Sequence, residues 1–209
     1  MRRKLPEKWT LDYKGLRFSV TTTPGRHLGV FPETAAHWDW YMQLIGKAGR
    51  PIKVLNLFGY TGIASLAAAK AGAMVTHVDA SKKSVTWARE NQELSKLGEK
   101  PIRWIVDDAL KFVQREGRRG AKYDGILLDP PKFGRGPKGE VWEVYESLPM
   151  LLEACRSVLS ENPLFLSLTM YAVRASAVHL HQSLSEMMSP FGGNAEAGEL
   201  VTQETSKGR

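Results

Sequence analysis

Short apolar runs alternate with amphipathic stretches along most of the chain. The apolar runs have the length and the Val, Ile and Leu content of buried strands. They predict strands at residues 53–57, 74–78, 102–106, 123–128 and 164–169. Apolar residues with helical spacing predict helices at residues 63–71, 82–97, 110–116, 145–159 and 174–188. Because strands and helices alternate, we expect a parallel sheet with helices on both faces.

The segment before this pattern predicts a smaller structure. Residues 9–20 resemble a β-hairpin with its turn at Lys14-Gly15, followed by a loop at 27–33 and a short helix at 34–45. The predicted fold is therefore α/β: a mostly parallel, doubly wound, Rossmann-like sheet with an N-terminal β-hairpin annex. We divide it into an annex at 1–45 and a main domain at 46–209. Residues 198–205 predict one further strand, which either joins the edge of the sheet or belongs to a longer protein.

Composition supports a globular protein, with 43% hydrophobic and 24% charged residues. No apolar run approaches the 18 to 20 residues, roughly, that span a bilayer, and no apolar segment follows the basic start, so we expect no membrane or secretory segment. The single cysteine, Cys155, cannot form an internal disulfide, which favours a reducing, cytoplasmic location. The net charge of +7 indicates either a polyanionic partner such as nucleic acid or simply a soluble surface.

Ligands of open parallel sheets bind beyond the carboxyl ends of the strands, so the residues there are candidates for a site. The first candidate turn opens a helix with Asn56, Phe58, Gly59, Tyr60, Thr61 and Gly62. Its Gly-x-x-Gly spacing lacks the third glycine of the dinucleotide pattern G-x-G-x-x-G. A pyrophosphate-binding oxidoreductase is therefore disfavoured.

Two further strand ends carry carboxylates. Asp79, followed by Ala80, either accepts hydrogen bonds from ribose hydroxyls or interacts with the helix that follows it. Asp108 either accepts a hydrogen bond from an adenine amino group, with Ala109 against the ring, or caps a helix. No His, Cys or Asp grouping has the spacing of metal ligands, so no metal is expected.

The turn after the fourth predicted strand reads Asp129-Pro130-Pro131-Lys132-Phe133. Two prolines make it rigid, so that Asp129 and the Pro130 carbonyl could orient a planar, amino-bearing substrate while Phe133 stacks on it. Lys132 and the basic, glycine-rich residues up to 139 suit phosphate contacts, or form a solvated loop. The candidate catalytic residues are Asp129, Pro130, Lys132 and Phe133.

Taken together, these motifs resemble those of class I S-adenosylmethionine-dependent methyltransferases. The Asp-Pro-Pro-Lys-Phe form resembles bacterial large-subunit ribosomal RNA methyltransferases that modify cytosine carbon 5 or guanine nitrogen 7. The resemblance implies that S-adenosylmethionine binds and leaves as S-adenosylhomocysteine, that ribosomal RNA is the substrate, and that the sheet ends in an antiparallel hairpin. It also implies that the loop at 27–33, with Phe31, covers the cofactor near Asp129.

The sequence departs from these relatives in one chemically informative way. Methylation of cytosine carbon 5 requires a cysteine thiolate to activate the ring. The family has this cysteine after the fifth strand, where this chain reads Leu166-Ser167-Leu168-Thr169-Met170-Tyr171. Cys155 lies on the apolar stripe of a predicted helix, which indicates a buried structural residue. We therefore expect methylation of a base nitrogen without a covalent intermediate.

Three alternatives remain open at this stage. The acceptor could be a protein or a small molecule, the chain could be a nucleotide-binding oxidoreductase, or it could be a non-catalytic RNA-binding module with this fold. The single Gly-x-x-Gly and the Asp-Pro-Pro turn disfavour the oxidoreductase. The motifs at Asp79, Asp108 and Asp129 disfavour the non-catalytic module. Composition and motifs leave the acceptor atom and the oligomeric state undetermined.

Overall fold

The computed structural model describes residues 6–22, 27–202 and 206. Its centre is a five-stranded parallel sheet in the order β5-β4-β3-β6-β9. The strands are β3 (Lys53–Leu57), β4 (Met74–Asp79), β5 (Ile102–Val106), β6 (Gly125–Leu128) and β9 (Phe165–Leu168). The chain builds outward from β3 to β5 and then returns to build outward from β6 to β9. The predicted parallel, Rossmann-like sheet is confirmed.

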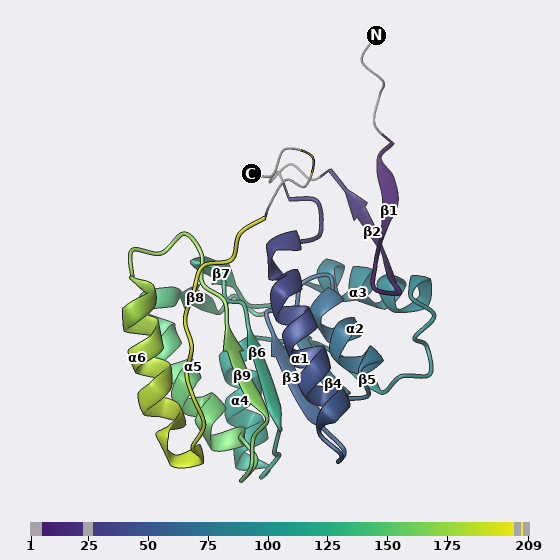
Figure 1. Ribbon diagram of the computed structural model, residues 1–209. Coiled ribbons are helices and arrows are strands. Elements are labelled where there is room, and N and C mark those ends of the chain that lie inside the picture. Colours follow the sequence, from purple (N-terminus) through teal and green to yellow (C-terminus); the bar gives the residue numbers. More distant parts are fainter. Residues whose placement is uncertain (1–5, 23–26, 203–205, 207–209) are drawn as a thin grey trace.

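Helices cover both faces of the sheet (Figure 1). One face carries α1 (Ala35–Lys47), α2 (Ile63–Lys70) and α3 (Lys82–Leu94). The other carries α4 (Ala109–Arg118), α5 (Val144–Val158) and α6 (Ala177–Met188). Strand β6 shows why its sequence is continuously apolar: Ile126 and Leu128 enter one hydrophobic cluster, and Leu127 enters the other.

Local capping explains where several helices begin and end. The Ser81 hydroxyl accepts a hydrogen bond from the Ser84 N–H at the start of α3, and Asp108 accepts one from the Lys111 N–H at the start of α4. Helix α3 ends earlier than predicted because Lys96 adopts a positive φ of 54°. A short 3₁₀ turn, η1 (Pro32–Thr34), precedes α1, and a second, η2 (Ser189–Phe191), follows α6.

The N-terminal hairpin forms as predicted, from β1 (Lys8–Tyr13) and β2 (Leu16–Thr21). Lys14 and Gly15 both have positive φ, as a two-residue hairpin turn requires. Strand β2 buries Leu16, Phe18 and Val20 in the same hydrophobic cluster as α1 and α2. The Ser19 N–H also donates to the Asn91 side chain on α3. The hairpin is therefore packed onto the α3 side of the domain.

Three expectations about strands were wrong in the described part of the chain. The segment after Asp129 contains a small antiparallel hairpin, β7 (Phe133–Arg135) and β8 (Val141–Glu143), where a loop was expected. Residues 198–202 belong to no strand, and residues 203–205 of that prediction lie outside the described part. In the described part the sheet ends at β9, without the antiparallel hairpin that the family resemblance implied. An extended segment without a ladder partner is only marginally stable as a strand.

Candidate functional site

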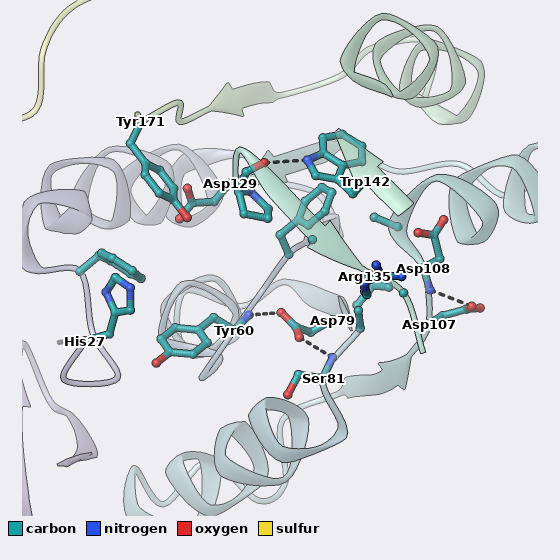
Figure 2. Close-up of a pocket in the computed structure, with 18 residues that line it drawn as sticks. His27, Tyr60, Asp79, Ser81, Asp107, Asp108, Asp129, Arg135, Trp142 and Tyr171 are labelled. Carbon is teal, nitrogen blue, oxygen red and sulfur yellow. Dashed lines mark hydrogen bonds between the residues drawn. The ribbon is translucent and has the colours of Figure 1, made fainter. Parts of the chain in front are cut away.

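A cavity of about 360 Å³ lies beyond the carboxyl ends of the central strands, next to the point where the strand order reverses (Figure 2). Eight of the residues singled out in the sequence line it: Phe31, Phe58, Tyr60, Asp79, Ala80, Asp108, Ala109 and Asp129. Three more, Gly134, Arg135 and Gly136, come from the glycine-rich stretch for which phosphate contacts were considered. The sequence did not assign site roles to the rest of the lining: His27, Val78, Ser81, Asp107, Pro131, Trp142 and Tyr171. This location is the one expected for ligands of open α/β sheets.

The turn after β3 has an unusual backbone. Phe58 and Tyr60, which both line the cavity, adopt positive φ values of 58° and 49°. Such values are rare for bulky residues and concentrate at functional sites. Between them, a Cβ on Gly59 would lie 2.4 Å from the His77 ring, so only glycine fits there.

The remaining predicted residues of this turn do not line the cavity but hold the turn in place. The Asn56 amide donates to the Ser65 hydroxyl at 2.9 Å, and the Thr61 hydroxyl donates to the Gly29 carbonyl at 2.6 Å. Gly62, with a φ of 82°, precedes α2 as its N-cap. Thr61 therefore ties this turn to the segment that carries Phe31.

Asp79, at the end of β4, joins two walls of the cavity. One carboxylate oxygen accepts a hydrogen bond from the Tyr60 N–H and the other accepts one from the Ser81 N–H, both at 2.8 Å. Burial raises the pKa of Asp79, although both hydrogen bonds oppose this shift. Each carboxylate oxygen can accept a second hydrogen bond, so Asp79 is held in place and can still bind hydroxyl groups.

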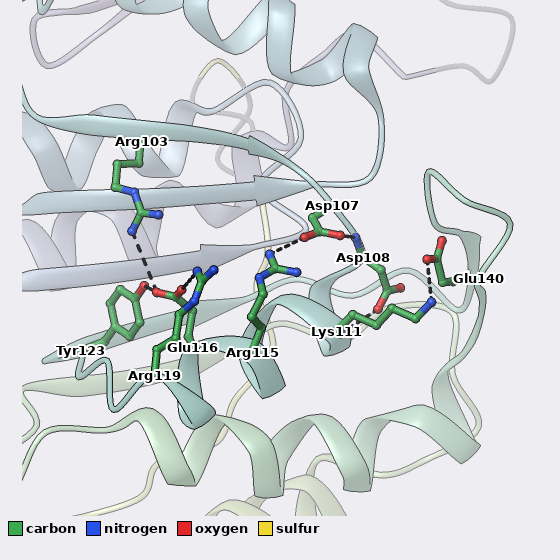
Figure 3. A network of polar contacts seen from close by, with 9 residues as sticks. All are labelled: Arg103, Asp107, Asp108, Lys111, Arg115, Glu116, Arg119, Tyr123 and Glu140. Atoms are coloured by element: carbon green, nitrogen blue, oxygen red, sulfur yellow. Dashed lines mark hydrogen bonds and ion pairs between the residues drawn. The ribbon is translucent and has the colours of Figure 1, made fainter.

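Asp107 and Asp108 follow β5 and are held from the side of α4 (Figure 3). Asp107 accepts a hydrogen bond from the Asp108 N–H at 2.9 Å and forms an ion pair with Arg115 at 2.5 Å. Asp108 caps α4 through the Lys111 N–H. The capping role considered for Asp108 is thus present, and both aspartates line the cavity.

Asp129, directly after β6, has a different environment. Its Oδ1 atom is buried and has no hydrogen-bond partner among the described residues. Burial raises the pKa of Asp129 to about 7, and the negative charge of Glu33 contributes to this shift. A buried acceptor without a partner is costly unless a ligand supplies a donor. This atom is the clearest sign that the cavity binds something with an N–H or O–H group.

The prolines after Asp129 are fixed by the β7–β8 hairpin. The Trp142 indole donates to the Pro131 carbonyl at 2.6 Å, and its ring packs on Phe58 with the centroids 4.8 Å apart. Pro131 lines the cavity and Pro130 does not. Trp142 therefore connects the turn after β3 with the turn after β6.

Lys132 and Phe133 lie outside the cavity lining. Phe133 is 62% exposed, and the Lys132 ammonium lies 5.6 Å from its ring centroid. Arg135, two residues further along β7, reaches the cavity. An ion pair between Glu140 in the hairpin loop and Lys111 on α4, at 2.8 Å, closes the loop onto the domain.

Aromatic rings also form part of the cavity lining. Phe31 lies 5.9 Å from Tyr60 and 6.2 Å from Tyr171, measured between ring centroids. Tyr171 follows β9, and its position at the carboxyl edge of the sheet is the only sequence signal that could have found it. Cys155 lies elsewhere, fully buried on α5, where burial raises the pKa of its thiol.

Among residues 6–22, 27–202 and 206, no helix is long and apolar enough to cross a membrane. Within the same residues, no group of three or more His, Cys, Asp or Glu side chains is placed to hold a metal ion.

Curated relatives resemble this chain over most of its length. A ribosomal RNA large subunit methyltransferase K/L of Shewanella sp. (strain ANA-3) is 36% identical over 163 residues, which are 77% of this chain and 22% of the relative. A ribosomal RNA large subunit methyltransferase I of Aeromonas salmonicida is 31% identical over 159 residues, 76% of this chain and 36% of the relative. The chain thus spans about a fifth to a third of the length of these relatives.

Solved structures show the same architecture. An S-adenosylmethionine-dependent methyltransferase from Agrobacterium tumefaciens superposes with a TM-score of 0.86 and 54% identity, over 90% of this chain and 60% of that one. The protein SMU.776, described as a methyltransferase and solved in complex with SAH, has a TM-score of 0.72 and 26% identity, over 93% of this chain and 49% of that one.

A family model described as conserved hypothetical protein 95 matches residues 34–154. The matched segment contains the sheet from β3 to β6, the turn at Gly59 and the carboxylates of the cavity. The chain therefore belongs to the conserved hypothetical protein 95 family and has the fold of the class I S-adenosylmethionine-dependent methyltransferases.

Proposed function

We propose that the protein transfers a methyl group from S-adenosylmethionine to a base nitrogen in RNA, with ribosomal RNA as the substrate, in the cytoplasm. The observation that carries this proposal is the buried Oδ1 of Asp129 at the cavity, which has no hydrogen-bond partner among residues 6–22, 27–202 and 206. The named activities of the relatives support it, as does the structure of SMU.776 in complex with SAH.

The cavity has the features that S-adenosylmethionine needs. Asp79 offers carboxylate oxygens to ribose hydroxyls, and Asp108 and Ala109 lie at the end of β5 for the adenine ring. Phe31, Phe58 and Tyr60 provide apolar surface, and a volume of about 360 Å³ falls in the range of small-molecule sites. The bound cofactor would supply an electrophilic methyl group on its sulfonium.

The chain's own contribution is to position and deprotonate the acceptor. The Asp129 carboxylate, fixed by the rigid prolines, can accept a hydrogen bond from an N–H group of the base. With its pKa raised to about 7, it can also take the proton that an amino nitrogen loses when it is methylated. The apolar walls of the cavity exclude water from the reacting atoms.

The position of Cys155 favours nitrogen over cytosine carbon 5. Its thiol is fully buried on α5 and does not line the cavity. Burial also disfavours the thiolate that carbon-5 chemistry needs. The residues that line the cavity therefore include no cysteine that could form a covalent adduct with the base.

Basic and aromatic residues around the cavity favour RNA over a protein or a small molecule. Lys132, Phe133 and Arg135 lie on or beside the exposed face of the β7–β8 hairpin, next to the cavity. The exposed Arg135 and the half-buried Lys132, beside the exposed ring of Phe133, suit phosphate contacts and base stacking.

The test measures transfer of labelled methyl from S-adenosylmethionine to unmodified ribosomal RNA and to assembled large subunits. We expect label on a purine or pyrimidine nitrogen after digestion to nucleosides. Asp129→Asn should lower kcat by about 100-fold or more, as loss of a general base does, while the Kd for SAH changes little. Asp12→Asn, on the exposed hairpin, is the matched control and should retain full activity.

Label on cytosine carbon 5 would contradict the proposed chemistry, and Cys155→Ala would show whether that thiol takes part. Binding of SAH without transfer to any RNA would instead indicate a protein or small-molecule acceptor.

A further inference from the structure

Phe133 was the aromatic residue expected to stack on the acceptor, but the structure places a different ring at the cavity. Phe133 is 62% exposed and outside the cavity lining, whereas Tyr171 lines the cavity and is 44% exposed. Tyr171 comes after β9, where the carbon-5 enzymes that the sequence resembles have their cysteine. The residue that lines the cavity from this stretch is therefore an aromatic ring.

Two observations place the Tyr171 ring beside the acceptor group Asp129. Figure 2 shows the two side chains on the same side of the cavity. Burial raises the pKa of Tyr171, and the charge of nearby Asp129 adds to this shift. The ring is also aligned with Phe31, with an angle of 30° between the planes and 6.2 Å between the centroids.

The backbone after the ring supports a fixed orientation. Ala172 has a positive φ of 56°, a conformation that is unfavourable for a residue with a Cβ and concentrates at ligand sites. Two residues further on, the Arg174 N–H donates to the Tyr145 hydroxyl at 2.6 Å, which anchors this segment to α5. The strained residue lies between the ring and this anchor.

We propose that Tyr171 is the stacking surface for the acceptor base, and that a single unstacked base lies on its ring with an N–H edge toward Oδ1 of Asp129. This inference rests on the proposed function and specifies its substrate: a base in an unpaired nucleotide or one turned out of its helix. Stacking supplies affinity for any base, and the buried carboxylate oxygen requires a donor on the edge that faces it.

The test compares Tyr171→Ala with Tyr171→Phe, which keeps the ring. The assay is methyl transfer to unmodified ribosomal RNA, and the Kd for SAH is measured separately by calorimetry. Tyr171→Ala should lower kcat/KM for RNA by about 10- to 100-fold, the range of one lost base stack. Tyr171→Phe should stay within about threefold of the unaltered protein, and the Kd for SAH should stay within about threefold in both variants.

Met150→Ala controls for loss of a half-exposed apolar side chain, because Met150 is 52% exposed on α5 and outside the cavity lining. Thermal unfolding of each variant identifies any loss of fold. An equal loss in the Ala and Phe variants would overturn stacking, because only the hydroxyl would then matter. A parallel loss of SAH affinity would also overturn it and assign Tyr171 to the cofactor.

The two proposals fail in different ways. If the unaltered protein methylates RNA and Tyr171→Ala does so equally well, only the stacking role is wrong. If the unaltered protein binds SAH but methylates no RNA, the RNA acceptor and the stacking role are both wrong.

Discussion

At the scale of single residues, the carboxylates of the cavity differ in how their oxygens are used. Asp79 and Asp107 each accept hydrogen bonds or an ion pair on both oxygens, whereas Oδ1 of Asp129 has no partner among the described residues. The first two hold the cavity together, and the third keeps an acceptor for a ligand. A site of this kind gives up stability for function.

This difference predicts how stability depends on pH. The folded-state pKa of Asp129 is about 7 and its ordinary value is 3.8, so the folded protein binds a proton that the unfolded chain releases. The stability that Asp129 contributes is fully present below about pH 4 and is lost as the pH rises through about 7. Asp129→Asn should therefore raise the free energy of unfolding at pH 8, by up to about 4 kcal/mol, and leave it nearly unchanged at pH 4.

Urea unfolding at the two pH values measures this effect. Asp12→Asn serves as the comparison, because Arg17 holds the pKa of exposed Asp12 below its usual value and its pH dependence has the opposite sign. Equal effects of Asp129→Asn on the free energy of unfolding at both pH values would show that folding does not raise the pKa of Asp129.

At the scale of elements, the β7–β8 hairpin is the main feature that sequence patterns did not predict. Strands of three residues are too short for an alternating pattern to be recognised, and glycines surround them. The structure shows that Gly134 and Trp142 pair across the hairpin, with Trp142 buried and Phe133 exposed. The hairpin thus brings the indole of Trp142 to the turn after Asp129.

Trp142→Phe tests the role of this contact. The variant keeps an aromatic ring against Phe58 but loses the hydrogen bond to the Pro131 carbonyl, so the turn that holds Asp129 becomes less fixed. We expect a kcat about 5- to 20-fold lower with little change in KM for S-adenosylmethionine, and a stability loss of about 1 kcal/mol.

Trp104→Phe is a matched control, because its indole donates to the Gln92 side chain at 2.9 Å and Trp104 does not line the cavity. It should lose a similar amount of stability and keep its kcat. A kcat that falls equally in both variants would point to general loosening of the fold.

At the scale of the whole molecule, the charge of +7 has a measurable consequence if RNA is the substrate. Contacts to phosphates release counterions, so raising the salt concentration from about 50 to about 200 mM should weaken RNA binding by roughly 10-fold or more. The Kd for SAH, measured in the same buffers, should change by less than about threefold, because SAH carries no phosphate. RNA binding that does not respond to salt would contradict phosphate contacts. The positive charge would then serve only to keep the protein soluble.

Much of the architecture could be predicted from the sequence, because the signals involved are local. The strands at 53–57 and 102–106 form as predicted. Residues 54–57 are continuously buried, as is typical of a strand covered on both faces. Lys14-Gly15 specifies a hairpin turn, and the glycines of the turn after β3 mark a backbone that few other residues tolerate. Asp79, Asp108 and Asp129 could be found because parallel strands all end at one edge of the sheet.

Only the tertiary structure decided which of these residues meet. The sequence determined a parallel α/β fold, the turns that follow its strands and a polar set at their carboxyl ends. It could not show that Tyr171 lines the cavity and Phe133 does not, or that Trp142 binds the Pro131 carbonyl. Nor could it show that Oδ1 of Asp129 has no hydrogen-bond partner within the described part of the chain. These outcomes depend on the packing of segments far apart in the chain, and no local pattern of hydrophobic and polar residues encodes such contacts.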